Sequence, residues 1–102
     1  MNDLIAAKAF DALGHANRVA VLRMLVQAGC NGLNVSQLRE ALDIPASTLA
    51  HHLKTLTDAG LVVQEKDGRE IRSCACYEKI RQLNAFLMED CCRGAFKESE
   101  EA

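Results

Sequence analysis

The chain has 102 residues, of which 49% are hydrophobic and 25% are charged, and its formal net charge is −2. This length allows a single domain, and the composition is that of a globular protein, which excludes a disordered or fibrous chain. The sequence contains no apolar run near the roughly 20 residues that a membrane span requires, and Asp3 stands where a signal peptide would carry positive charge, so a cytoplasmic protein is expected.

Four helices are predicted in the first 60 residues. Asn17 is expected to be the N-cap of the second helix and Asn34 that of the third, because Asn side chains readily accept hydrogen bonds from the first turn. Pro45 suits the start of the fourth helix, and Gly60 suits its end. The predicted helices cover about residues 2–13, 17–27, 35–42 and 46–59. The last two are short and closely joined, which is the pattern of a helix-turn-helix.

A hairpin and a final helix are predicted after Gly60. Residues 61–66 and 70–76 flank Asp67-Gly68, which is the strongest short signal for a hairpin. A helical pattern resumes near Tyr77 and continues to Gly94, with one side formed by Ile80, Leu83, Asn84, Leu87 and Cys91. The predicted fold class is mainly α with a β-hairpin wing (α+β), a winged helix-turn-helix in the order ααααββα. Residues 1–97 would form this single domain, and residues 98–102 an acidic tail.

The fourth predicted helix has one apolar and one polar face. At 100° per residue, Leu49, Leu53 and Leu56 lie together, which leaves the opposite face free of the core. Hydroxyl, amino and imidazole groups on that face can hydrogen-bond to phosphates or to base edges in a major groove. The candidates for DNA contact are Ser47, Thr48, His51, Lys54 and Thr55, and a plain solvated face is the alternative. His52 lies nearer the apolar edge, so we expect it to pack at a helix–helix seam.

Three cations surround the predicted hairpin turn. Lys66, Arg69 and Arg72 are long enough to meet phosphates or to enter a minor groove. A solvated hairpin tip is the alternative. The net charge of −2 does not decide between these possibilities, because only the local field at the contact surface matters.

Three segments of the sequence resemble one family of bacterial regulators. They are DALGHANRVAVLRML, VSQLREALDIPASTLAHHLKTLTDAGLV and the wing that follows, and they cover nearly the whole chain. The run from Ala50-His51-His52-Leu53-Lys54 through Ala59-Gly60-Leu61-Val62 resembles one of the most specific features of the ArsR/SmtB family. The resemblance implies a homodimer in which the first and last helices pack together and each fourth helix enters a major groove of double-stranded operator DNA. It also implies repression that a bound inducer relieves.

The cysteines are the candidates for inducer binding. Five cysteines, an odd count in a protein expected to be cytoplasmic, fit metal or redox chemistry better than structural disulfides. Arsenic-responsive members of the family carry Cys-Val-Cys on the third helix, but this chain has Asn34-Val35-Ser36, so that sensor is missing. The resemblance suggests a second kind of site, formed between subunits where the start of one last helix meets the end of its antiparallel partner. The corresponding positions do not form a zinc set here, since they are Tyr77, Lys79, Asp90 and Arg93.

Cysteines lie beside those positions. Cys74 and Cys76 would share one face of a strand and could meet Cys91 and Cys92 of the partner chain. Within one chain, Cys76 and Cys92 would be roughly 24 Å apart along a helix, which favours a site shared across the dimer. Such thiolates would bind an arsenite- or antimonite-like metalloid, or zinc, cadmium or cuprous ion, as the inducer, and DNA binding itself would require no cofactor. The alternative for Cys91 is a small buried hydrophobe. Cys30 has no evident partner cysteine, and we interpret it as structural.

Two other functions would use the same cysteines differently. The same fold could act as a repressor that responds to thiol oxidation or to persulfide formation. A small dithiol oxidoreductase using Cys74-Ala75-Cys76 is less favoured, because the sequence has no Cys-x-x-Cys before a helix and no glycine-rich phosphate loop. The sequence therefore predicts a transcriptional regulator and not an enzyme.

Overall fold

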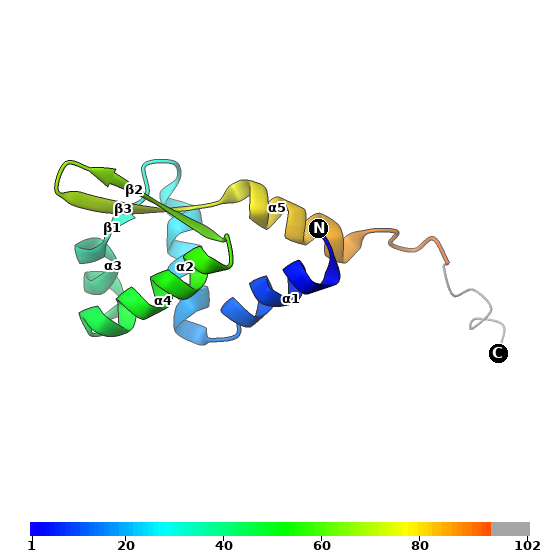
Figure 1. The fold of residues 1–102 in the computed structure, drawn as a ribbon, viewed down its shortest axis with the longest axis horizontal. Helices are drawn as coiled ribbons and strands as arrows, with labels where there is room; N and C mark the ends of the chain where they lie inside the picture. The colour runs from blue at the N-terminus through cyan, green and yellow to red at the C-terminus, as the bar shows by residue number, and fades with distance from the viewer. Residues whose placement is uncertain (95–102) are drawn as a thin grey trace.

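The structure is a computed structural model that describes residues 1–94 (Figure 1). Its elements, in chain order, are α1 (Asp3–Ala12), α2 (Ala16–Ala28), β1 (Leu33–Asn34), α3 (Val35–Leu42), α4 (Ala46–Asp58), β2 (Val62–Asp67), β3 (Glu70–Ala75) and α5 (Tyr77–Met88). The winged helix-turn-helix predicted from the sequence is confirmed. The predicted domain boundary at residue 97 and the acidic tail 98–102 lie outside the described residues.

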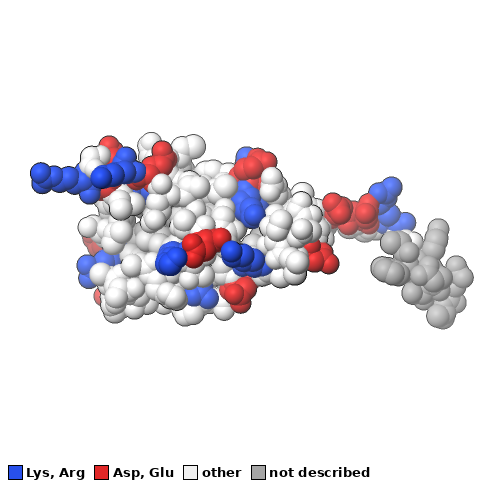
Figure 2. Space-filling view, viewed as in Figure 1, with Lys and Arg blue, Asp and Glu red and all other residues white. Residues whose placement is uncertain are grey.

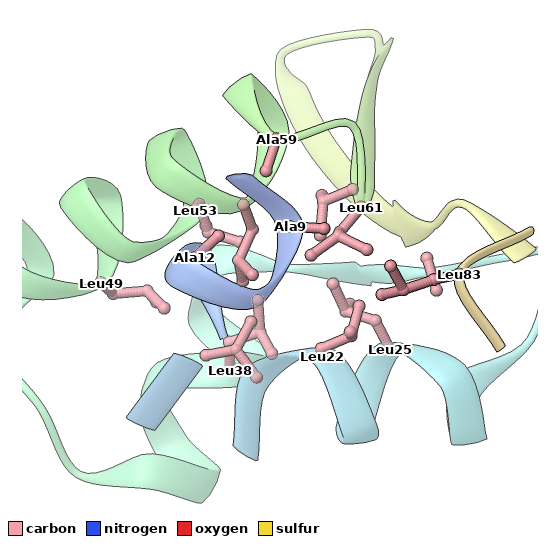
Figure 3. Close-up of a cluster of buried hydrophobic side chains, with 14 of the residues drawn as sticks. Ala9, Ala12, Leu22, Leu25, Leu38, Leu49, Leu53, Ala59, Leu61 and Leu83 are labelled. Atoms are coloured by element: carbon pink, nitrogen blue, oxygen red, sulfur yellow. The ribbon is translucent and has the colours of Figure 1, made fainter. Parts of the chain in front are cut away.

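The hydrophobic core lies where the helices converge beneath the sheet (Figure 3). Leu25 of α2, Leu38 of α3, and Leu49 and Leu56 of α4 are fully buried. Leu61, also fully buried, follows α4 and joins the same cluster. Burial of each such side chain contributes about 1.5–3 kcal/mol, so these leucines fix the position of α4 relative to α2 and α3.

The start of α3 was predicted correctly and the start of α2 was not. Asn34 accepts a hydrogen bond from the Gln37 backbone N–H at 2.8 Å, and the Gln37 side chain accepts one from the Asn34 backbone N–H, which completes a capping box. The N-cap of α2 is His15, not Asn17, because its Nδ1 atom accepts a hydrogen bond from the Asn17 backbone N–H at 3.2 Å. An imidazole nitrogen can therefore cap a helix as an Asn oxygen does.

The wing belongs to a three-stranded antiparallel sheet in the order β1-β3-β2. β1 was not predicted, because two residues are too few to show a strand periodicity. The hairpin turn lies one residue later than the predicted Asp67-Gly68. Asp67 pairs with Glu70, so Gly68 and Arg69 are the central residues, and Gly68 has φ +68°. A glycine with positive φ at the first central position is typical of a type II′ hairpin turn.

The last helix is shorter than predicted, because α5 ends at Met88 and not near Gly94. Glu89 leaves the helical conformation, with φ −55° and ψ 131°, and Asp90 and Cys92 have φ values of +60° and +63°. Two carboxylates at the C-terminal end of a helix oppose its dipole, and Asp tolerates the left-handed region well. Cys91 and Cys92 therefore lie beyond α5, and the predicted placement of Cys91 on its apolar stripe is wrong.

Both α1 and α5 extend to the end of the molecule away from the wing, and they carry exposed apolar side chains there (Figure 1). Leu4 is 82% exposed, Leu87 59% and Met88 63%. Ile5 and Phe10 of α1 are also exposed. Within residues 1–94, no helix has the length and apolarity needed to span a membrane.

Candidate DNA-binding surface and cysteine sites

The exposed face of α4 lies opposite the leucines that fix the helix on the core. Ser47 and His51 are exposed, whereas Leu49 and Leu53 are buried. The N-cap of the helix is Pro45, which has no side chain to accept hydrogen bonds from the first turn. Uncapped backbone N–H groups at a helix start attract anions such as phosphate. The face therefore combines free backbone donors with polar side chains that can approach a DNA groove.

The other polar residues predicted on α4 differ in their exposure. Lys54 is exposed, and its Nζ atom lies 3.0 Å from the Asp58 carboxylate. A surface ion pair of this kind contributes little to stability, so Lys54 can exchange Asp58 for a phosphate. Thr48 and Thr55 are half-buried, and Thr55 lines a hollow beside Asp11 of α1. Thr55 therefore lies toward α1, which corrects its predicted position on the free face.

The wing presents two exposed cations near its turn, Lys66 and Arg69. Figure 2 shows basic side chains projecting beyond the wing tip. Arg72 is instead half-buried, and its guanidinium donates to the Asn31 carbonyl at 3.2 Å and lies 3.5 Å from the Asp67 carboxylate. Arg72 thus joins the wing to the loop after α2, whereas Lys66 and Arg69 remain available to DNA.

His52 packs between helices, as the sequence predicted. It is 4% exposed, its ring centroid lies 4.7 Å from that of His15, and its Nδ1 atom lies 3.5 Å from Nη1 of Arg18. Burial lowers the pKa of His52, and the nearby charges of His15, Arg18 and His51 lower it further. Its Nε2 atom is buried without a hydrogen-bond partner among the described residues. A neutral His52 therefore holds α4 against the start of α2.

Cys91 and Cys92 form an exposed pair just beyond α5. Their sulfur atoms lie 3.0 Å apart, and the hydrogen bond between the two thiols raises the pKa of Cys91. Two adjacent sulfurs can bind one soft ion or metalloid at the same time. The structure therefore brings this predicted pair together, although on a turn rather than on a helix.

Cys74 and Cys76 have different environments, although the sequence predicted that they share a strand face. Cys76 is half-buried at the N-cap of α5, after β3 has ended at Ala75. The neighbouring Tyr77 hydroxyl donates to the Val26 carbonyl at 3.0 Å, which fixes the start of α5 on α2. Cys76 and the pair beyond α5 lie at opposite ends of a 12-residue helix, about 18 Å long. One chain therefore keeps the two predicted halves of the site apart.

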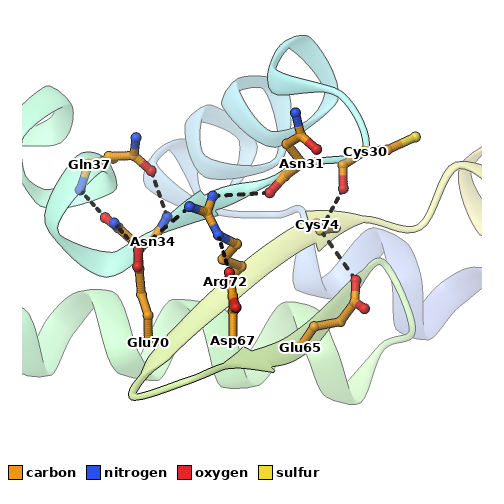
Figure 4. Close-up of polar contacts among 9 residues, drawn as sticks. All are labelled: Cys30, Asn31, Asn34, Gln37, Glu65, Asp67, Glu70, Arg72 and Cys74. Atoms are coloured by element: carbon orange, nitrogen blue, oxygen red, sulfur yellow. Dashed lines mark hydrogen bonds and ion pairs between the residues drawn. The ribbon is translucent and has the colours of Figure 1, made fainter.

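Cys74 is buried at the base of the wing, beside Cys30, a neighbour that no sequence pattern indicated (Figure 4). The Cys74 thiol donates to the Cys30 carbonyl oxygen at 3.4 Å and to Oε1 of Glu65 at 3.9 Å. Burial raises the pKa of Cys74, and the Glu65 carboxylate raises it further. Cys30 is exposed on the loop between α2 and β1, and the contact joins segments that no local pattern connects. Among the side chains of residues 1–94, no three of His, Cys, Asp or Glu are grouped as ligands for a metal ion.

Comparison with known proteins gives matches over most of the chain. Residues 13–65 match the family model described as "Helix-turn-helix domain". An uncharacterized HTH-type transcriptional regulator, YceK, of Bacillus subtilis (strain 168) is 37% identical over 68 residues, which are 67% of each chain. A putative arsenical resistance operon repressor, ArsR, of Halobacterium salinarum is 40% identical over 58 residues, which are 57% of this chain and 44% of that protein.

The solved structures include a similar fold over nearly the full length. An ArsR-like transcriptional regulator from Rhodococcus sp. RHA1 superposes with a TM-score of 0.80 at 27% sequence identity. The match covers 95% of this chain and 89% of that one.

Proposed function

We propose that this chain is a homodimeric cytoplasmic repressor that a thiol-binding inducer releases from its operator. The proposal proceeds from the family: the chain belongs to the ArsR family of helix-turn-helix DNA-binding transcriptional regulators, which are not enzymes. The observation that carries the DNA-binding part is the exposed face of α4, with Ser47 and His51 opposite the buried leucines. Lys66 and Arg69 on the wing would add phosphate contacts beside the groove. Thr48, Thr55 and Arg72 would contribute less, because each is partly buried within the chain.

A selection from a randomised DNA duplex library tests this part even though the operator sequence is unknown. We expect the reduced protein to enrich a two-fold symmetric sequence whose half-sites are about one helical turn apart. The double variant Ser47→Ala/His51→Ala should lose that enrichment, whereas Gln27→Ala, an exposed change on α2, should keep it. Equal enrichment by the wild type, the double variant and Gln27→Ala would show that these α4 side chains do not recognise the DNA sequence.

The proposed dimer would bury the exposed apolar ends of α1 and α5. Leu4, Leu87 and Met88 are large apolar side chains that are more than half exposed. Burial of each against a second copy would contribute about 1.5–3 kcal/mol. The variant Leu87→Glu should sediment as a folded monomer at concentrations at which the wild type is a dimer. A monomeric wild type, or a Leu87→Glu dimer of unchanged strength, would exclude this face as the interface.

We propose that the inducer binds the Cys91–Cys92 pair together with a sulfur from the partner subunit. The pair supports this because its two thiols are exposed and lie 3.0 Å apart, so two ligands are already adjacent. Antiparallel packing of two α5 helices would bring the pair of one chain to the start of α5 in the other, where Cys76 lies. Cys74 is a weaker candidate than Cys76, because it is buried and its thiol already donates to the Cys30 carbonyl and to the Glu65 carboxylate.

A mixed dimer tests whether the site is shared. One subunit carries Cys74→Ser and Cys76→Ser, and the other carries Cys91→Ser and Cys92→Ser, so one shared site keeps every thiol and the other keeps none. Titration of the reduced mixed dimer with arsenite should give one bound arsenite and DNA release. The control dimer pairs a wild-type chain with a chain in which all four cysteines are serine. If the mixed dimer binds no arsenite and the control dimer binds one, the site lies within one subunit. If polysulfide or peroxide alone releases the DNA, and the protein binds neither arsenite nor a metal ion, the inducer is an oxidant and not a metalloid.

A further inference from the structure

A hollow of about 550 Å³ opens at the base of the wing, and two cysteines distant in the sequence line it. Cys30 reaches it from the loop between α2 and β1, and Cys74 reaches it from β3 (Figure 4). Neither the α4 face nor the Cys91–Cys92 pair uses this hollow. Its loop runs between Gly29, with φ +82°, and Gly32, with φ +66°.

The sulfur of Cys74 lies almost within bonding reach of the Cys30 side chain. It lies 3.4 Å from the Cys30 carbonyl oxygen, and a carbonyl oxygen lies about 2.4 Å from its own Cα, so Cys74 Sγ is at most about 5.8 Å from Cys30 Cα. In a disulfide, three bonds join that Cα to the partner sulfur, with a reach of up to about 4.5 Å. Figure 4 shows the Cys30 side chain directed away from Cys74. A rotation of Cys30 and a loop movement of about 1 Å would bring the sulfurs together.

We infer that Cys30 and Cys74 form an oxidation-sensitive pair that closes to an intrachain disulfide when a hydroperoxide reaches the exposed Cys30 thiol. In the first step, the Cys30 sulfur attacks the peroxide, the O–O bond breaks, and a sulfenic acid and one water or alcohol are formed. In the second step, Cys74 gives its proton to the Glu65 carboxylate, and its sulfur attacks Cys30 Sγ. The S–O bond breaks and hydroxide leaves as water after taking a proton. Two thiols lose two electrons, and one peroxide gains them.

The order of these steps follows from the two environments. Cys30 is exposed and meets the oxidant first, whereas Cys74 is buried and meets only Cys30. The thiol of Cys74 already donates to Glu65, so a proton acceptor is present where the second step requires one. The buried sulfur therefore resolves the sulfenic acid rather than forming one.

Closure of the pair would act on the wing, because the loop that carries Cys30 also holds Arg72. The Asn31 carbonyl accepts a hydrogen bond from Arg72, and Arg72 contacts Asp67, the last residue of β2 before the wing turn. The loop movement that brings Cys30 toward Cys74 would shift the neighbouring Asn31 and break this hydrogen bond. Oxidation would therefore release the base of the wing and lower DNA affinity by about five-fold or more, a typical coupling between two sites. This consequence rests on the proposed function, whereas the disulfide does not.

Peptide mapping tests the pair itself. The reduced wild type and the variant Cys76→Ser/Cys91→Ser/Cys92→Ser are each treated with hydrogen peroxide, alkylated and digested without reductant. We expect a peptide that links Cys30 to Cys74 in both proteins, and dithiothreitol should remove it. Adding Cys30→Ser, an exposed change, should abolish the link while circular dichroism stays unchanged. Absence of the link in the triple variant would overturn the inference. The inference would also be overturned if the pair forms no link after peroxide alone and zinc chloride, added before the alkylating reagent, protects both thiols from alkylation.

A second measurement tests the effect on DNA. The triple variant, bound to the duplex selected by the wild type, should lose affinity on oxidation and regain it with dithiothreitol. Complete linkage with unchanged affinity would overturn the regulatory part of the inference. Failure of the reduced wild type to select any duplex would instead refute the proposed function, because the linked peptide forms without DNA.

Discussion

Substitution of Gly32 by Ala should destabilise the protein much more than the same change at Gly29, three residues earlier in the same loop. A Cβ atom at Gly32 would lie 2.4 Å from the Ser73 carbonyl oxygen and 2.6 Å from Cys74 Sγ, whereas one at Gly29 would meet nothing within 4 Å. Gly32 has φ +66°, and Gly29 has φ +82° with ψ −165°; an L-residue in such sparsely populated regions costs about 1–3 kcal/mol. Overpacking adds about 1–3 kcal/mol at Gly32 only. We therefore expect losses of about 2–6 kcal/mol for Gly32→Ala and about 1–3 kcal/mol for Gly29→Ala.

Urea unfolding followed by circular dichroism measures both losses. The effect of Gly-to-Ala replacement on the unfolded chain is the same for the two variants, so it cancels in their difference. Gly68→Ala, in the wing turn with φ +68° and open space around it, is a second control for the backbone cost. If Gly32→Ala destabilises the protein no more than both Gly29→Ala and Gly68→Ala, the loop does not pack against β3, and the geometry inferred for Cys30 and Cys74 loses its basis.

Three further predictions concern DNA and pH. Ser47→Ala or His51→Ala should each weaken binding to the selected duplex by about 1–3 kcal/mol without changing dimerisation, as titration by fluorescence anisotropy would show. Arg69→Ala should weaken binding to all duplexes alike, and the slope of log affinity against log salt concentration should fall by about one unit per contact. Arg23→Ala, which removes an exposed cation on α2, should change neither quantity. A loss limited to one sequence would mean that the wing reads bases. The pKa of His52 is lowered from 6.5, so below about pH 6.5 the unfolded chain binds a proton that the folded chain does not, and the free energy of unfolding should fall as pH decreases. His52→Gln should flatten this dependence in urea titrations at pH 5 to 8, and an unchanged slope would assign the acid sensitivity to another group.

The helices were predictable because their signals are local. The Asn34 capping box lies within four consecutive residues, and the apolar spacing of α4 separates the leucines from Ser47 and His51. The position of His52 at a seam followed from the same periodicity. Such patterns depend only on neighbouring residues and not on the rest of the chain.

The features that the sequence did not predict depend on contacts between distant segments. β1 exists only because Leu33 and Asn34 pair with Ser73 and Arg72 of β3. Cys30 was expected to lack a partner because Cys74 lies 44 residues later, and no periodicity connects a loop with a strand. The early end of α5 depended on backbone angles after Met88 that apolar spacing does not report.

The strand β1 also has a mechanical consequence for the whole molecule. Asn34 is at once the N-cap of α3 and the last residue of β1, and its side chain donates to Glu70 of β3. Asn34 therefore links the helix-turn-helix to the wing, so that a tilt of one would move the other. In the proposed DNA complex, two elements held in fixed relative orientation would lose little configurational freedom when they dock, which favours tight binding. In the proposed homodimer, a signal that displaced this unit would change the distance between its two copies, and a duplex with fixed half-site spacing tolerates little such change.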